Sequence, residues 1–307
     1  MTKMTNITVH LTSGVKLEKA FSKLALDLSK VERLTIAGML LEGDFKYLRK
    51  KSGKTLRELD LSQAATIDNS IGYDAFRSCS GLESIILPAL INEIGDNAFR
   101  GCNGLKNIVL PDSIYRIGEN AFRDCSSLKN TALPRSLNRI DYNAFRNCSG
   151  LTEFTLPPLV NKLGGELFAG CKGLTSITVH PENTSYTSEN RILLTKDGTR
   201  LIFCPVIQKG AFIIPDTVTE IAQGAFYGCK GLTSIDIPNT VTKIGHHAFF
   251  GCIGLTSVIL PDSLTEIGTQ AFDNCKNLKL ISIPESLKKT GEYPFFQWQH
   301  FEIRSKK

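Results

Sequence analysis

The chain has 307 residues, 42% of them hydrophobic and 21% charged, which is the composition of a soluble protein with a well-filled core. It contains no run of 18 apolar residues, so we expect no membrane-spanning helix. The net charge of +6 is small for this length, and the basic residues are spread along the chain apart from a cluster at 49–54. We therefore expect no nucleic-acid partner.

Residues 1–30 lack the pattern of the rest of the chain and are predicted to form an N-terminal cap. ITVHL at 7–11 predicts a strand, and Leu17, Phe21, Leu24 and Leu28 follow at helical spacing. Such a helix would cover the first turn of a repeat structure. The opening MTKMTNITVH has no apolar segment of a signal peptide, which predicts either a cytoplasmic protein or a chain without its leader.

A repeat with a period of 23 residues occupies 31–179 and resumes over 211–289. The repeated phenylalanines are Phe76, Phe99, Phe122, Phe145, Phe168, Phe226, Phe249 and Phe272. The cysteines in step with them are Cys79, Cys102, Cys125, Cys148, Cys171, Cys229, Cys252 and Cys275. A fixed period in this range is the signature of a leucine-rich solenoid, whose turns bury their apolar sides by stacking.

The turn at 251–273, GCIGLTSVILPDSLTEIGTQAFD, indicates how each repeat folds. Leu255, Val258 and Leu260 are predicted to point into the core from a short strand, with Ser257 and Ile259 on the opposite side. Proline ends the strand because it has no backbone N–H to donate. Matching strands are predicted at 31–36, 56–61, 82–88, 105–111, 128–134, 151–157, 174–179, 232–238 and 278–284.

The cysteines are expected to be buried and reduced. In-phase side chains of stacked strands lie about 4.8 Å apart and point the same way, whereas a disulfide needs Cβ atoms about 3.5–4.5 Å apart. A line of thiols also cannot surround a tetrahedral metal ion. Cys204 is out of phase with the others and is the one cysteine that we would test for reactivity.

The interruption at 180–210 separates Cys171 from Cys229 by 58 residues, which is not a multiple of the period. ILLT and RLIF are strand-like, and the Lys196–Thr199 tetrapeptide KDGT between them is a turn signal. We predict a β-hairpin insertion that protrudes from one turn or extends it.

Residues 290–307 keep the glycine and phenylalanine positions of the repeat but lose the alanine and the cysteine. They are predicted to form a C-terminal cap, with a dimer interface as the alternative. The aromatic residues that would seal the last turn are Tyr293, Phe295, Phe296, Trp298 and Phe301.

The pattern IGxxAFxxCxxLxxIxLP, present as IGDNAFRGCNGLKNIVLP at 94–111, resembles the Treponema pallidum-type or BspA-like leucine-rich repeat. The likeness covers about the whole chain, and the segments LTIAGML at 34–40, GDFKYLR at 43–49 and LRELDLS at 56–62 resemble Bacteroidales members. It implies an α/β-type leucine-rich-repeat solenoid with mainly short parallel β-strands in 23-residue turns. The departures are Asp141 and Ala222 in place of the motif glycine, Leu167 in place of alanine, and Thr131 in place of the strand isoleucine.

The resemblance implies a cell-surface or secreted protein that mediates adhesion, and it implies no catalytic residues. The sequence itself has no HExxH, CxxC pair, P-loop or EF-hand pattern, so we expect no enzyme, cofactor or metal. The adjacent His246 and His247 are interpreted as surface residues, with a pH-sensitive or metal-contacting pair as the alternative.

The outward strand positions form the first candidate binding surface, because solenoids present such ladders to partners. Exposed apolar residues among them can mark a protein interface, while a plain solvated sheet is the alternative. The candidate residues are Ser84, Ile86, Asn107, Val109, Asn130, Glu153, Thr155, Ser234, Asp236, Ser257 and Ile259.

A column of arginines is the second candidate surface. Arg77, Arg100, Arg123 and Arg146 each follow an Ala-Phe pair and would stack one turn apart. They could form an anion-binding strip for a sulfated glycan or an acidic protein. The favoured alternative is local pairing, of Arg100 with Asp96 and of Arg123 with Glu119 at helical spacing, and of Arg77 and Arg146 with the rings of Tyr73 and Tyr142.

The leading functional hypothesis is a non-catalytic protein-binding module used for adhesion to host or neighbouring-cell proteins, such as an extracellular-matrix protein. The alternatives are an intracellular protein-interaction scaffold and a binder of anionic glycans. By resemblance we expect a cell-surface or secreted location, with a cytoplasmic location as the alternative.

Overall fold

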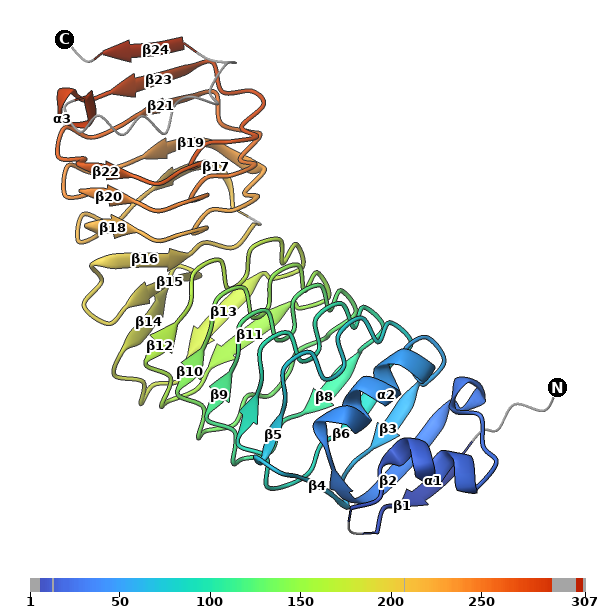
Figure 1. Ribbon diagram of the computed structural model, residues 1–307. Coiled ribbons are helices and arrows are strands. Elements are labelled where there is room, and N and C mark those ends of the chain that lie inside the picture. The colour runs from blue at the N-terminus through green and yellow to red at the C-terminus, as the bar shows by residue number, and fades with distance from the viewer. Residues whose placement is uncertain (1–5, 13, 207, 289–301, 306–307) are drawn as a thin grey trace. The chain divides into compact units, whose positions relative to one another are not determined.

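The computed structural model describes residues 6–12, 14–206, 208–288 and 302–305 (Figure 1). The chain divides into two compact units, residues 1–171 and residues 172–307. Each unit consists mainly of short parallel strands linked by turns, which confirms the predicted leucine-rich-repeat solenoid. Within the described residues, no helix is both long and apolar enough to cross a membrane.

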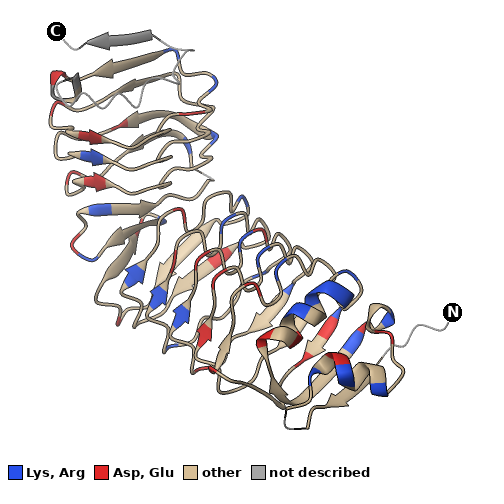
Figure 2. Cartoon of the chain, viewed as in Figure 1, with Lys and Arg blue, Asp and Glu red and all other residues tan. Residues whose placement is uncertain are grey.

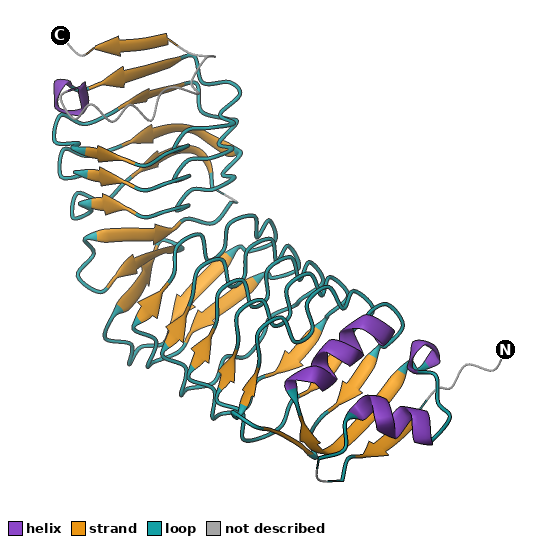
Figure 3. Cartoon of the chain, in the orientation of Figure 1, coloured by secondary structure: helices purple, strands orange, loops and turns teal. Residues whose placement is uncertain are grey.

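The first unit has two parallel sheets, to which the successive turns contribute (Figure 3). The first sheet has the order β1 (Ile7–His10), β2 (Arg33–Leu40), β3 (Glu58–Asp60), β6 (Ser84–Ile86) and β8 (Asn107–Val109), with β4 (Ala64–Thr66) pairing to the end of β2. The second sheet contains β5 (Ser70–Ile71), β7 (Glu93–Ile94), β9 (Arg116–Ile117), β10 (Arg139–Ile140) and β12 (Lys162–Leu163). Strand β11 (Glu153–Leu156) also belongs to this unit.

The predicted strand at 128–134 is wrong, because the structure forms no strand there. The Thr131 hydroxyl donates to the Lys129 carbonyl at 3.3 Å. The Asn130 Oδ1 accepts from the backbone N–H groups of Thr152 and Glu153, at 3.2 and 3.1 Å. These side chains thus occupy groups that would otherwise join the backbone ladder, a known competition for Asn and Thr.

The second unit begins with β13 (Ser176–Val179) and an antiparallel meander of β14 (Tyr186–Glu189), β15 (Ile192–Thr195) and β16 (Arg200–Phe203). The predicted hairpin is therefore confirmed as β15 and β16, and β14 is an additional strand. The hairpin extends the turns, because β16 pairs in parallel with β18 (Glu220–Ile221), which is followed by β20 (Lys243–Ile244) and β22 (Glu266–Ile267).

Two further parallel sheets complete the second unit. One pairs β17 (Lys209–Ile213) with β19 (Gly231–Asp236), and the other has the order β21 (Ser257–Ile259), β23 (Leu280–Ile283) and β24 (Glu302–Ser305). The short helix α3 (Glu285–Lys288) follows β23. The five aromatic residues of the predicted C-terminal cap lie outside the described residues.

The N-terminal part of the chain, residues 6–52, contains more helix than the sequence analysis predicted. Helix α1 (Leu17–Lys23) is followed by a 3-10 turn, η1 (Leu28–Lys30), and a second helix, α2 (Glu42–Ser52), was not predicted. The buried Asp44 carboxylate joins the two helices by accepting from the backbone N–H groups of Leu17 and Leu41, at 2.8 and 2.9 Å. Negative charge at helix N-termini is stabilising there.

The predicted helical face through Leu24 is wrong in one respect, because α1 ends before it and the Leu24 side chain is 52% exposed. Ala25 takes φ = +50°, and the Leu26 N–H donates to the Phe21 carbonyl. This is a Schellman-type helix end. A residue other than glycine occupies the left-handed position, so the sequence gives no warning of it.

A column of stacked phenylalanines forms the centre of each unit. In the first unit the ring centroids of Phe76, Phe99, Phe122 and Phe145 are 5.3, 5.4 and 5.4 Å apart, and all four rings are buried. Past Phe145 the separation widens to 6.3 Å, and the Phe154 ring lies edge-on to both Phe145 and Phe168. The break coincides with Leu167, which replaces the smaller alanine of the motif.

Two left-handed residues flank the Ala-Phe pair in each regular turn. They are four residues apart, as in Asn97 and Gly101 with φ of +56° and +75°, or Asn120 and Asp124 with φ of +54° and +64°. Glycine, asparagine and aspartate tolerate this conformation best. The variable positions of the motif are therefore restricted by backbone geometry as well as by exposure.

The motif glycine lies close to the backbone of the preceding turn at most positions of the repeat. A Cβ atom on Gly164 would lie 2.2 Å from the backbone nitrogen of Tyr142, and one on Gly268 would lie 2.2 Å from that of His246. Asp141 and Ala222 nevertheless keep the ladder, because their N–H groups donate to Ile117 and Leu201 as the glycines do to their own partners. The departures therefore do not interrupt the repeat.

The cysteine column is buried and free of disulfides among the described residues, as expected. Six of these thiols donate to the carbonyl of the phenylalanine one turn earlier, as in Cys102 to Phe76 at 3.0 Å and Cys125 to Phe99 at 3.1 Å. Cys204 occupies the corresponding phenylalanine position, because its own carbonyl lies 3.7 Å from the Cys229 Sγ. Its phase differs because it belongs to the other column.

We expect Phe122→Ala to lower the free energy of unfolding by about 3–5 kcal/mol, because it removes a fully buried ring from the middle of the column. Urea denaturation followed by circular dichroism measures the change. The matched control Val109→Ala, at a side chain that is 76% exposed, should change stability by less than about 0.5 kcal/mol. Equal losses in the two variants would contradict the stacked core.

We expect all nine cysteines to resist a thiol reagent in the folded protein at pH 8. Burial raises the pKa of the Cys79, Cys171 and Cys275 thiols to about 12, so their thiolate fraction is reduced about a thousandfold or more. Mass spectrometry after labelling counts the modified residues, and the denatured chain serves as the control. Rapid native labelling of any of the three would show that burial does not protect it.

Candidate functional site

The strand face of the first unit, meaning the outward side chains of β3, β6, β8 and β11, contains the predicted ladder. Ser84 pairs in register with Asn107, and Ile86 with Val109. Ile86 and Val109 are 52% and 76% exposed. Glu153 and Thr155 are also exposed on β11, so the outward direction predicted for these residues is confirmed.

Asn130 is the exception on this face, because it lies in the segment without a strand. Its side chain is exposed, but its Oδ1 is engaged by Thr152 and Glu153 in the next turn. The Asn130 side chain therefore holds the neighbouring turn, and its amide oxygen is already engaged within the chain.

Charged residues next to the ladder pair with one another. Arg33 lies 3.1 Å from Glu58, and Glu83 contacts both Arg57, at 3.6 Å, and Lys106, at 2.6 Å. The hydrogen bond from the Lys106 ammonium lowers the pKa of the Glu83 carboxyl. The charges at this edge are thus largely balanced, which leaves the apolar residues as its distinctive feature.

The predicted strand-face residues of the second unit are also exposed. Ser234 and Asp236 lie on β19, in register with Ala211 and Ile213 of β17. Ser257 and Ile259 lie on β21, where the Ile259 side chain is 63% exposed.

Further exposed apolar residues of the first unit were missed by the sequence analysis. Ile67 and Leu90 occupy the same position of successive turns and are 66% and 76% exposed, and Met39 is 43% exposed. The next two turns carry serine at this position, where the hydroxyls of Ser113 and Ser136 donate to carbonyls of the preceding turn, and the turn after them carries the exposed Leu159. The replacement of this serine by leucine was a signal available in the sequence.

The arginine column, defined as Arg77, Arg100, Arg123 and Arg146, has pairing partners other than those predicted. Arg77 lies 3.2 Å from Asp74, Arg123 lies 3.5 Å from Asp124, and Arg146 pairs with Glu166. In the described part of the chain Arg100 forms no ion pair with Asp96, nor Arg123 with Glu119. The helical spacing behind that prediction is wrong, because the segment is a tight turn with left-handed residues.

The predicted ring stacking is wrong as well. The structure shows no ring contact of Tyr73 or Tyr142 with a guanidinium among the residues it describes, and the two side chains are 68% and 51% exposed.

The carboxylate of Asp96 instead belongs to a cluster with charged residues of the second sheet, whose strands carry acidic and basic positions in Figure 2. Arg116 contacts Glu93, Asp96 and Asp141, at 2.9 Å for Asp96 and 2.6 Å for Asp141. Asp141 also pairs with Arg139, which explains the aspartate in place of the motif glycine. The cluster joins three turns and is internally compensated, so we assign it a structural role.

Among the described residues, no group of three His, Cys, Asp or Glu side chains could hold a metal ion. His246 and His247 diverge as expected for surface residues, since His246 contacts Thr269 and His247 contacts Gln270.

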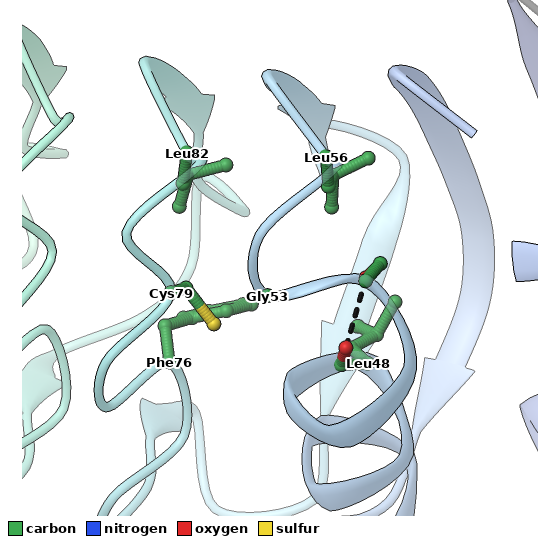
Figure 4. Close-up of a pocket in the computed structure, with 7 residues that line it drawn as sticks. Leu48, Gly53, Leu56, Phe76, Cys79 and Leu82 are labelled. Atoms are coloured by element: carbon green, nitrogen blue, oxygen red, sulfur yellow. Dashed lines mark hydrogen bonds between the residues drawn. The ribbon is translucent and has the colours of Figure 1, made fainter. Parts of the chain in front are cut away.

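A small cavity lies between α2 and the first turn of the repeat (Figure 4). It is lined by Leu48, Ser52, Gly53, Leu56, Phe76, Cys79 and Leu82. Its volume of about 10 Å³ would admit at most one water molecule. The Ser52 hydroxyl already donates to the Leu48 carbonyl, so the cavity is a packing gap at the junction of helix and repeat.

Solved structures with the same fold include bacterial leucine-rich repeat proteins. A leucine-rich cell surface protein from Faecalibacterium prausnitzii is 21% identical, with a TM-score of 0.58 over 99% of this chain and 87% of that chain. A leucine-rich repeat protein from Eubacterium ventriosum is 24% identical, with a TM-score of 0.57 over 68% of this chain and 63% of that chain. The pneumococcal vaccine antigen PcpA is 23% identical, with a TM-score of 0.54 over 83% and 63%. The chain thus spans about 63% of the length of the last two proteins.

The sequence also matches a family model, while no curated protein matches the chain. The model describes the BspA type leucine rich repeat region, and six copies of it match residues 69–190 and 203–305. These ranges cover well over half of the chain and contain the phenylalanine and cysteine columns described above. The chain therefore belongs to the BspA-type leucine-rich repeat family.

Proposed function

We propose that the protein is a non-catalytic binding module whose strand face in the first unit contacts a partner protein. The observation that carries this proposal is the pair of exposed apolar side chains, Ile86 and Val109, on adjacent rungs of one ladder. Ile67 and Leu90 are two further exposed apolar side chains of the first unit that could add to such a contact. Leucine-rich repeats of this kind generally mediate protein–protein interaction.

The energetics favour an apolar contact over a charged one at this face. Full burial of one such aliphatic side chain contributes about 1.5–3 kcal/mol, so a few of them would dominate an interface. The neighbouring charges of Arg57, Glu83 and Lys106 already pair with one another, and surface ion pairs contribute little. Arg57, Glu83 and Lys106 would therefore contribute more to the specificity of binding than to its affinity.

We further propose that the module acts in adhesion at the cell surface, with a host or neighbouring-cell protein as the partner. Support comes from the Faecalibacterium prausnitzii protein of the same fold, which is described as a cell surface protein. The alternative is an intracellular scaffold that uses the same face. Immunodetection on intact cells of the source organism, with and without external protease, distinguishes the two locations.

We expect Ile86→Glu with Val109→Glu to weaken partner binding at least about tenfold, because two charges would have to be buried at an apolar contact. Surface plasmon resonance against immobilised extracellular-matrix proteins and mucins measures the affinity.

The matched control is Leu24→Glu with Tyr73→Glu, which changes two side chains of similar exposure, 52% and 68%, away from the ladder. Equal binding by both double variants and the original protein would refute the strand face as the contact. Absence of binding to every immobilised protein would instead refute adhesion to the matrix and favour the intracellular scaffold.

A further inference from the structure

We propose that the arginine column of the first unit binds an acidic α-helix of a partner protein, laid along the column with one carboxylate facing each arginine. The column lies on the turns after the Ala-Phe pairs, apart from the strand face, so this proposal is independent of the proposed function.

The spacing of the column is set by the buried core. Each arginine directly follows a phenylalanine of the stack, and the ring centroids repeat at 5.3–5.4 Å. Backbone bonds hold the arginines themselves in step, because the Arg100 carbonyl accepts from Ser78 at 2.6 Å and the Arg123 carbonyl from Gly101 at 2.7 Å. The backbone that carries the four arginines is therefore held in register from turn to turn.

An α-helix has a pitch close to the repeat of the phenylalanine rings from which the arginines follow. It rises about 5.4 Å per turn, and side chains three or four residues apart lie about 5–6 Å from each other. Same-side residues of an extended strand repeat at about 6.8 Å, and the phosphates of one DNA strand at about 3.4 Å along the axis. A stripe of glutamates on a helix would thus stay in register with successive arginines, and guanidinium–carboxylate pairs are strong charge-assisted contacts.

Within the column as the structure describes it, the positive charge that remains uncompensated is that of Arg100. Asp74 serves both Arg77 and Arg49 of α2, while Asp124 pairs with Arg123 and Glu166 with Arg146. In the part of the chain that the structure describes, Arg100 has no ion pair or side-chain hydrogen bond. Arg100 is therefore the guanidinium most available to a ligand.

In the turn of Arg100, whose residues are all described, the hydrogen bond between the arginine and the asparagine three residues before it is also missing. Asn120 and Asn143 accept from the arginine three residues later, at 3.3 and 3.5 Å. The equivalent Asn97 Oδ1 is buried and has no hydrogen-bond partner within the described residues. Arg100 has thus been released from the local contact that its neighbours make.

The surroundings leave room for a helix at this end of the column. Ser78 is exposed beside Arg77, and Gly101 beside Arg100 has no side chain. The exposed Lys50 and Lys51 of α2 follow Arg49, which shares Asp74 with Arg77, and the end of α2 is basic in Figure 2. The nearby carboxylates of Asp96 and Glu119 are engaged by Arg116 and Asn120.

Fluorescence anisotropy with two labelled alanine-rich peptides tests the proposal on the full chain. One peptide carries glutamates at i, i+4, i+7 and i+11, in a single stripe, and the other has the same composition with the glutamates distributed around the helix. We expect the striped peptide to bind about tenfold more tightly at low salt, and to dissociate as ionic strength rises. Equal binding of the two peptides, or no binding of the striped one, would overturn the proposal.

The variant Arg100→Gln with Arg123→Gln should weaken binding of the striped peptide about fivefold to tenfold. The matched control, Arg57→Gln with Lys106→Gln, removes the same charge from the strand face and should leave binding within about twofold. Equal losses in the two variants would reduce the effect to net charge and overturn the site. Heparin binding that needs Arg100 and Arg123, without peptide binding, would assign the column to sulfated glycans instead of a helix.

Discussion

The structure depends on one constraint, which is that backbone groups of each turn bond to the same groups of the next turn. In the first unit the Phe76, Phe99 and Phe122 N–H groups donate to the alanine carbonyls of the following turns, at 2.7–2.8 Å. Equal turn length follows, because an extra residue would move every later group off its partner. The phenylalanine stack, the cysteine column and the motif glycine are consequences of this ladder, since each occupies a site that recurs in register.

The ladder explains why so much of the fold could be predicted from the sequence. A period in the chain becomes a column in space, so the burial of Val258, the exposure of Ile259 and the reduced cysteines followed from position alone. The prediction failed where side chains compete with the ladder, as Asn130 and Thr131 do. It also failed at Ala25 after α1, because the left-handed conformation there is taken by alanine, a residue type that does not indicate it.

The candidate sites were predictable in location but less so in their interactions. The exposed, paired positions of Ile86 and Val109 could be predicted from the alternation of side chains along a strand, and the arginine column from the 23-residue period. The partners of Arg100 and Asp96 did not follow, because helical spacing was assumed for a turn containing two left-handed residues. Ile67 and Leu90 were overlooked because the motif was read for its invariant positions, whereas binding surfaces are made from the variable ones.

The meander of β14, β15 and β16 has a consequence for how such proteins change length. Its antiparallel strands absorb a segment that is not a whole number of turns, and β16 then presents a regular edge on which β18, β20 and β22 continue. An irregular insertion is therefore tolerated where it folds against itself, while elsewhere only the gain or loss of entire repeats preserves the pairing. Duplication in steps of one repeat would lengthen either surface while conserving its pitch, so recombination could adjust the number of contacts to a partner without altering the geometry of any one contact.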